Sequence, residues 1–299
     1  MQPLTMTTAV TTWTPDALGL LLAVGLGTGY AWCLRKVPGW PLARTAAFFG
    51  VGLGSLLAVS VTFVGAYDDA LFWVRAVQVI VLLMITPFGL ALGAPLTLAK
   101  EASNNDKIDR ILAGRTVKFL TCPPVGSIIL LATPWLLYFT GWYDAVLRDG
   151  GIDAASRLAL IAIGFVYFYG RLQIDPMPRR YPHLVAVGIT FVEVVFDAAL
   201  GLVLWLGPKL VGHYDRAWGP SHRLDQIIGA GVLWIGGDVA GLPFLAALFR
   251  RMIADDAKET RKVDEELDAQ EPTGKLWWED HPELSERFRR ESGRPRGRY

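Results

Sequence analysis

The chain is poor in charge for its size. Asp, Glu, Lys and Arg make up 19% of its 299 residues, whereas 52% are hydrophobic. A soluble domain of this length needs many more charges to cover its surface. The apolar residues gather in runs of about 20, the number that an α-helix needs to cross a hydrocarbon core about 30 Å thick. The composition therefore predicts an all-α polytopic membrane protein that lies in a lipid bilayer.

Cysteine and histidine are also scarce, which limits the disulfides and the metal or haem sites that the chain can form. The two cysteines, Cys33 and Cys122, cannot form a disulfide framework. None of the four histidines lies in mid-span to ligate haem, and the last apolar run has no lysine to hold retinal. The sequence has no HExxH motif, phosphate-binding loop, nucleophile–base arrangement or basic-aromatic patch. We therefore expect neither an enzyme nor a nucleic-acid binder.

Seven apolar runs predict seven membrane-spanning helices. They lie at 16–34, 44–66, 71–97, 118–140, 156–174, 182–206 and 226–250. No Lys or Arg precedes the first run, so we expect this span to be retained rather than cleaved as a signal.

The loop charges predict an orientation. The second loop, YDD at 67–69, has no Lys or Arg, whereas the first, third and fifth loops are rich in them. Because cytoplasmic loops carry the excess of positive charge, we expect the N-terminus outside and the C-terminus in the cytoplasm of a bacterial cell. Charges of both signs crowd the sequence after Phe249, so we divide the chain into a bundle at 1–252 and a cytoplasmic tail at 253–299.

Glycines four residues apart recur in three of the spans. Small residues at this spacing let helices approach closely in lipid. We therefore expect tight helix packing at three pairs of positions: Gly25 and Gly29, Gly50 and Gly54, and Gly237 and Gly241.

Four charged residues stand out because they lie at depth in the predicted spans: Arg75, Glu193, Asp197 and Asp238. Each such charge costs roughly 2.5–3.5 kcal/mol at a helix centre, so these residues are expected to face the bundle interior and to pair. At a rise of about 1.5 Å per residue, Arg75 can reach Glu193 or Asp197 and tie helix three to helix six. Two other interpretations stay open. Arg75 extends to the outer headgroups, or the four residues line a path for ions or protons.

Five segments follow one another in an order that is typical of a known family. They are LLMITPFGLALGAPLTLA at 82–99, GWYDAVLRDGGID at 141–153, IDPMPRR at 174–180, FDAALGLVLWLG at 196–207 and LDQIIGAGVLWIGG at 224–237. With them the chain resembles the CtaG family of cytochrome c oxidase assembly factors, the seven-helix bacterial membrane type, over about residues 40–250. The family-motif positions are Pro87, Gly93, Pro95, Asp175, Pro176, Gly201, Asp225, Gln226 and Trp234.

The resemblance implies copper handling during maturation of the oxidase, through histidines in helices three, five and six. The chain departs from that pattern at each position. Arg75 and Val79 occupy the helix-three pair, Asp153 and Arg157 the helix-five pair, and Asp197 the helix-six position. Arginine stays protonated in proteins and cannot ligate a metal cation. We therefore expect a salt-bridged set of Arg75, Asp153, Arg157 and Asp197 to tie the helices together in place of a metal site.

Weaker candidates for a metal site remain elsewhere. His213 and His222 lie in the sixth loop near acidic residues, and Cys33 and Cys122 lie near the cytoplasmic ends of their helices. Ordinary polar loop residues and small buried hydrophobes are the plainer interpretations of these pairs. Asp225 opens helix seven, where we expect it to cap the helix, and a partner-facing role for it and Gln226 also stays open.

Three functions follow from these observations. The first is an integral membrane factor in assembly of the respiratory oxidase, acting on its subunits in the bacterial plasma membrane. The second is a permease or ion-conducting bundle that uses the intramembrane Arg, Asp and Glu residues. The third is a structural accessory subunit bound permanently to a respiratory complex. Copper is the cofactor in question, and the missing histidines leave its presence open.

Overall fold

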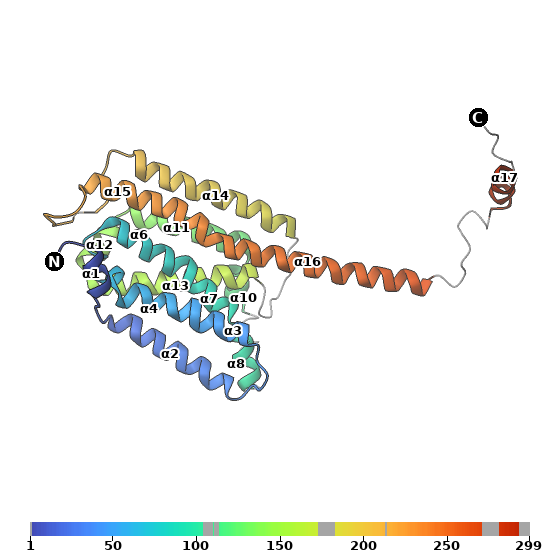
Figure 1. Ribbon diagram of the computed structural model, residues 1–299, viewed down its shortest axis with the longest axis horizontal. Coiled ribbons are helices and arrows are strands. Elements are labelled where there is room, and N and C mark those ends of the chain that lie inside the picture. Colours follow the sequence, from blue (N-terminus) through green and yellow to red (C-terminus); the bar gives the residue numbers. More distant parts are fainter. Residues whose placement is uncertain are drawn as a thin grey trace. The chain divides into compact units, whose positions relative to one another are not determined.

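The computed structural model describes residues 2–103, 110, 114–172, 183–212, 214–270 and 281–292, and its regular elements there are helices. Contacts divide the chain into two units, Met1–Leu248 and Phe249–Tyr299. The elements are labelled in Figure 1. In chain order they are α1 (Met6–Thr11), α2 (Ala17–Leu34), α3 (Leu42–Ala46), η1 (Ala47–Leu53), α4 (Gly54–Val61), α5 (Phe63–Tyr67), α6 (Phe72–Ile80), η2 (Val81–Ile85), α7 (Thr86–Leu92), α8 (Pro95–Ser103), α10 (Arg115–Leu120), α11 (Pro123–Phe139), α12 (Trp142–Arg148), α13 (Gly150–Leu172), α14 (His183–Leu206), α15 (His222–Gly231), η3 (Val232–Gly236), α16 (Gly237–Gln270) and α17 (Pro282–Ser292).

Six helical segments within the described residues are long and apolar enough to cross a membrane. They are Ala17–Leu34, Leu42–Val61, Phe72–Ser103, Gly150–Leu172, Gly188–Leu206 and His222–Ala246. A seventh is counted if Pro124–Phe139 and Trp142–Arg148, which are bent by 66° to one another, form one broken span. The protein is therefore an all-helical, multi-pass membrane protein, as the sequence predicted. The orientation in the membrane stays a prediction.

Two threonines end helices of the first unit, and only the first of them does so inside a predicted span. Thr62 donates from its hydroxyl to the carbonyl of Ala58 and accepts from the N–H of Val64, so it ends α4 and begins α5 inside the predicted span 44–66. Thr140 donates to the carbonyl of Leu136 and accepts from the N–H of Trp142 in the same way. The second break is followed by α12, a helix within what the sequence predicted as a loop. Helix α13 then begins at Gly150, before the predicted start at 156.

Pro87 sets a close contact in the middle of the bundle. Proline has no N–H, so it cannot bond to the carbonyl four residues earlier, which is that of Leu83. The π-helical segment η2 lies just ahead of it, as is common where a helix is interrupted. Gly164 of α13 packs against the freed carbonyl so closely that a Cβ there would lie 2.0 Å from the oxygen of Leu83. A glycine is required at this crossing of α13 and η2.

The glycine pairs that the sequence singled out do not mediate helix packing. A Cβ added at Gly25, Gly50, Gly237 or Gly241 would meet no atom within 4 Å, and the same holds at Gly29. Gly54 would meet only a carbonyl of its own helical segment. The prediction is wrong because spacing along one helix does not identify the face that another helix covers. The close approaches involve other glycines, among them Gly89, where a Cβ would lie 2.3 Å from the backbone nitrogen of Gly52 in η1.

Helices α1, α12 and α15 gather at one end of the first unit, and α3, α8 and α10 gather at the other (Figure 1). We call the first of these the Asp16 end, because Asp16 caps the start of α2 there. The turn between α5 and α6, the start of α13 and the loop between α14 and α15 complete this end. The polar side chains described next lie there.

Candidate functional site

Arg75 lies in the first turn of α6 and is only 5% exposed. Its Nη1 donates to Oδ1 of Asp153 at 2.6 Å and to Oε1 of Gln78 at 2.9 Å. Its Nε donates to the backbone carbonyl of Asp68 at 3.2 Å. The guanidinium therefore points into the protein, and the interpretation in which it extends to the headgroups is wrong.

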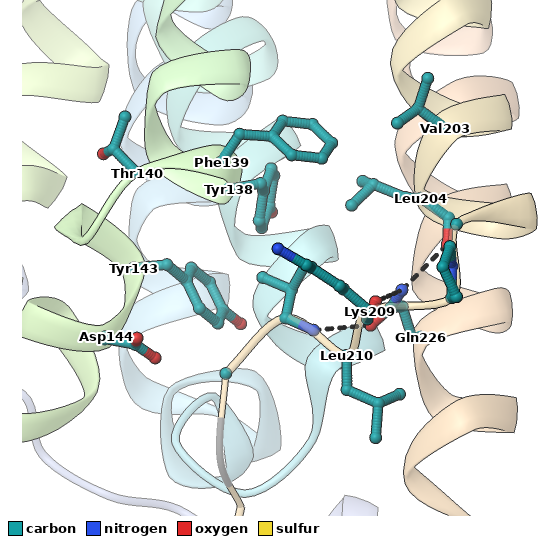
Figure 2. Close-up of a pocket in the computed structure, with 14 residues that line it drawn as sticks. Tyr138, Phe139, Thr140, Tyr143, Asp144, Val203, Leu204, Lys209, Leu210 and Gln226 are labelled. Carbon is teal, nitrogen blue, oxygen red and sulfur yellow. Dashed lines mark hydrogen bonds between the residues drawn. The ribbon is translucent and has the colours of Figure 1, made fainter.

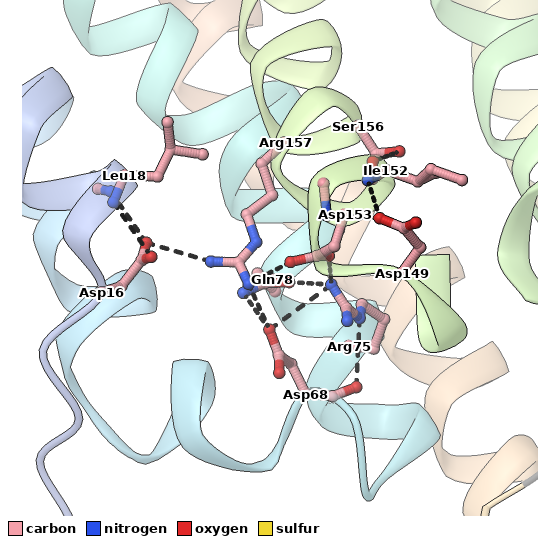
Figure 3. Close-up of polar contacts among 12 residues, drawn as sticks. Asp16, Leu18, Asp68, Arg75, Gln78, Asp149, Ile152, Asp153, Ser156 and Arg157 are labelled. Atoms are coloured by element: carbon pink, nitrogen blue, oxygen red, sulfur yellow. Dashed lines mark hydrogen bonds and ion pairs between the residues drawn. The ribbon is translucent and has the colours of Figure 1, made fainter. Parts of the chain in front are cut away.

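Arg157, one turn after Asp153 in α13, binds the carboxylates of Asp153 and Asp68, which Arg75 also contacts. Its Nη2 contacts the carboxylate of Asp153, which is four residues earlier, and lies 3.4 Å from Oδ2 of Asp68. Its Nη1 donates to Oδ2 of Asp16 at 3.1 Å, and that carboxylate also accepts from the N–H of Gly19 at the start of α2. Two arginines thus join the start of α2, the α5–α6 turn, α6 and α13 (Figure 3).

The six residues Asp16, Asp68, Arg75, Gln78, Asp153 and Arg157 form what we call the arginine cluster. It holds three carboxyl groups and two guanidinium groups, so one negative charge is in excess when every group is ionised. Burial raises the pKa of Asp68 above its ordinary value of 3.8, and this effect exceeds the opposing attraction of Arg75 and Arg157. Asp68 is therefore the member of the cluster best placed to hold a proton.

Glu193 and Asp197 do not take part in this cluster, so the predicted pairing of Arg75 with either of them is wrong. Glu193 on α14 instead accepts from the hydroxyl of Tyr167 at 2.9 Å and lies 3.5 Å from Nη2 of Arg171. Helix α13 begins at Gly150, before the predicted start at 156, and its first turn places Asp153 beside Arg75.

Asp197 and Asp238 are half-buried residues of α14 and α16 whose charges act on each other. Glu193 also acts on Asp197 electrostatically. The charged residues that the sequence singled out therefore form two separate groups among the described residues. Arg75, Asp153 and Arg157 belong to the arginine cluster, and the three acidic residues of α14 and α16 lie apart from it.

Asp225 is fully buried and caps a helix other than its own. Its two carboxylate oxygens accept from the N–H groups of Phe72 and Trp73, each at 3.0 Å, at the start of α6. Nη2 of Arg216 donates to it at 2.9 Å. The cap of α15 is Ser221, so the prediction that Asp225 caps its own helix is wrong. The carboxylate instead fixes α15 to α6 at the free N–H groups of a helix start.

Gln226 fastens the loop that follows α14. Its Oε1 accepts from the N–H of Val211 at 2.8 Å. Its Nε2 donates to the carbonyls of Leu204 and Lys209, at 2.9 Å and 3.1 Å. The side chain thus satisfies one N–H and two carbonyls that the end of α14 would otherwise leave free.

Other family-motif positions also form joints between helices. The carbonyl of Gly93, at the end of α7, accepts from the hydroxyl of Tyr30 at 2.9 Å, and Pro95 then begins α8. A Cβ at Gly201 of α14 would lie 2.6 Å from Cβ of Trp234, so two motif positions pack directly against each other. The motif residues Asp175 and Pro176 lie outside the described residues.

The positions where the resemblance implies copper ligands do not fit a metal ion. Both oxygens of Asp153 already bind guanidinium groups, and Arg75 and Arg157 cannot donate a lone pair. Across the described ranges, no group of three or more His, Cys, Asp and Glu side chains is arranged to hold a metal. We therefore assign no copper site to these positions.

The weaker candidates are also scattered. Cys33 is half-buried near the end of α2, and Cys122 is half-buried just ahead of α11. His222 is exposed at the start of α15, and His213 lies outside the described residues.

Asp16, Asp68 and Gln78 are the members of the cluster that the sequence argument missed. Asp16 has a recognisable signal, since an aspartate directly ahead of an apolar run is typical of a helix N-cap. Asp68 lies in the YDD turn, where an acidic residue is ordinarily solvated, and nothing in its local sequence indicates burial.

Comparison with known proteins places these observations in context. A family model described as cytochrome c oxidase caa3 assembly factor matches residues 28–255. Uncharacterized proteins of Mycobacterium bovis and Mycobacterium tuberculosis are each 27% identical to the chain over 287 residues, and one of Mycobacterium leprae is 24% identical over 287 residues. Each alignment covers 90% of this chain but 43% of the relative, so the chain spans less than half of their length. No solved structure matches the chain.

Proposed function

The chain belongs to the cytochrome c oxidase caa3 assembly factor family, and on this premise we propose that it is a membrane scaffold that holds oxidase subunits during assembly without binding copper itself. The arginine cluster carries this proposal. Three of its residues, Arg75, Asp153 and Arg157, occupy positions at which the family resemblance implies metal-ligating histidines in helices three and five, and their ion pairs join these two helices. A bundle tied in this way keeps the shape of an assembly factor without a metal-handling site.

The proposal includes a location and an orientation. We place the chain in the bacterial plasma membrane with the Asp16 end outside and the charged tail after Phe249 in the cytoplasm. The positive charges of the first, third and fifth loops support this orientation. Neither catalytic activity nor nucleic-acid binding is part of the proposed role.

The geometry supports an ion-conducting bundle less well. A polar path needs groups that follow one another across the membrane, and those of the described residues are separated. Arg75 is held by Asp68 and Asp153 near the Asp16 end, whereas Glu193 is held by Tyr167 and Arg171 on other turns of α13 and α14. Uptake of ions into proteoliposomes that disappears in Glu193→Gln would favour the conducting bundle instead.

Deletion and complementation in the native host test the scaffold. We expect deletion to lower assembled oxidase and added copper not to restore it. We also expect full complementation by a variant that lacks the four candidate metal ligands, with Cys33, Cys122, His213 and His222 each changed to Ala. Rescue of the deletion strain by copper alone would contradict the proposal. So would failure of this variant despite normal amounts of folded protein in the membrane.

Affinity purification from membranes then identifies the bound partners. A scaffold is expected to retain oxidase subunits before the enzyme is complete and to leave the mature complex. Recovery at equal amounts with mature oxidase would show a permanent accessory subunit instead. An unrelated multi-pass membrane protein with the same tag is the control, because it reports subunits that are retained without specificity.

A further inference from the structure

A cavity of about 420 Å³ opens at the Asp16 end, between the end of α11, the start of α12, the end of α14 and the loop that follows. Figure 2 shows its side chains. Tyr138 and Tyr143 line one side, and Leu204, Lys209 and Gln226 line the other. The cavity lies at the level where the span Gly188–Leu206 ends, which is the depth of lipid headgroups beside a membrane helix.

Tyr138 has a buried hydroxyl group without a partner. The residue is 4% exposed, and its Oη has no hydrogen-bond partner among the described residues. The neighbouring Tyr143 differs, because its hydroxyl hydrogen-bonds that of Tyr214. A buried hydroxyl is nearly always hydrogen-bonded in folded proteins, so an orphaned one indicates a missing group. The hydroxyl of Tyr138 is a donor at neutral pH, and it suits an anionic oxygen.

Lys209 supplies the matching charge. Its side chain is exposed, and its ammonium group turns toward the two tyrosines in the cavity (Figure 2). Its ammonium group has no carboxylate within ion-pair distance in the described part of the chain. The hydroxyl of Tyr138 is covered, so a ligand reaches it when a lining side chain moves. Lys209, with its long flexible stem, is the lining residue best suited to move.

The remaining lining selects the kind of anion. Phe139, Val203 and Leu210 present apolar surface beside the ammonium group, which suits a ligand with both an anionic oxygen and a hydrocarbon chain. Asp144 lines the same cavity from α12 and favours a cation next to the anionic group. We propose that this cavity binds the headgroup of a zwitterionic phospholipid, with the phosphate at Lys209 and Tyr138.

Thermal unfolding of the full chain in detergent, with added lipid, tests this site. The probes are phosphatidylethanolamine, diacylglycerol with the same chains, and inorganic phosphate. We expect saturable stabilisation by the phospholipid and none by the other two. Equal stabilisation by diacylglycerol, or displacement of the phospholipid by inorganic phosphate at similar concentration, would overturn the assignment.

Two variants locate the effect. Lys209→Gln removes a charge-assisted hydrogen bond and is expected to weaken phospholipid binding about tenfold or more. Tyr138→Phe removes only the orphaned hydroxyl, so it should weaken binding severalfold while leaving the lipid-free protein at least as stable as the parent. Arg148→Gln is the matched control, since it removes a positive charge from α12 without touching the cavity. Unchanged binding in both Lys209→Gln and Tyr138→Phe would refute the proposal.

Discussion

Replacement of Arg75 by Met removes the centre of the arginine cluster while keeping much of the side-chain volume. The substitution deletes the donors to Asp153, Gln78 and the carbonyl of Asp68. It also leaves three carboxyl groups with one guanidinium group, that of Arg157. Because Arg75, Asp68 and Asp153 are buried, water compensates little of the loss.

The expected cost follows from these contacts. Removing one partner of a buried ion pair costs about 3–5 kcal/mol, because the remaining charge stays buried. Asp153 and Asp68 keep Arg157, which favours the lower part of that range, whereas the freed carbonyl of Asp68 adds about 1 kcal/mol or more. We therefore expect Arg75→Met to lower the free energy of unfolding by roughly 4 kcal/mol.

Unfolding by SDS titration in detergent micelles measures this change. Arg148→Met is the control, since Arg148 is exposed and makes no ion pair within the described residues. In the Arg75→Met background, Asp153→Asn is expected to recover about 1 kcal/mol or more, because it restores the charge balance. Asp197→Asn should recover nothing. A loss no larger than that of Arg148→Met, or equal rescue by the two neutralising changes, would refute the reasoning.

Three further predictions concern other parts of the bundle. Because the pKa of Asp68 is raised, the folded protein keeps a proton that the unfolded chain releases above pH 3.8. Stability should therefore fall as pH rises through the folded pKa of Asp68. In a thermal-unfolding series over pH, Asp68→Asn should flatten that fall. Gly89→Ala should lower the free energy of unfolding in the same SDS titration by about 1–3 kcal/mol or more, because its Cβ would meet the backbone of Gly52. Gly50→Ala is the control, since its Cβ would meet no atom within 4 Å, and it should be neutral or stabilising. Asp225→Asn should lower the unfolding midpoint by leaving a buried arginine without its charge partner, and a midpoint equal to that of the parent would contradict its role as the link to α6.

The sequence predicted the fold class and most spans because lipid imposes a simple rule. A helix must be apolar over its length to cross the bilayer, and that property is local. The break at Thr62 was missed because a threonine hydroxyl can cap one helix or bond back within another with little change in hydropathy. The early start of α13 was missed because its first turn is polar.

The candidate site was only partly predictable for a related reason. Hydropathy identified Arg75 as a residue that needs a partner, and helical spacing placed Asp153 and Arg157 on one face. Neither property identifies which loop folds over a side chain, so Asp68 was left out and Asp197 was included in its place. The partner of Asp225 was also inaccessible, since Phe72 lies 153 residues away in the sequence.

Metal analysis of the purified full chain tests the central claim most directly. The chain is exposed to Cu(I) and Cu(II) and washed. Its copper content is then compared with that of the variant in which Cys33, Cys122, His213 and His222 are changed to Ala. We predict that copper content is equally low in the two proteins, because guanidinium groups occupy the positions where ligands would stand. About one tightly bound copper ion per chain that is lost on Asp153→Asn would contradict the account.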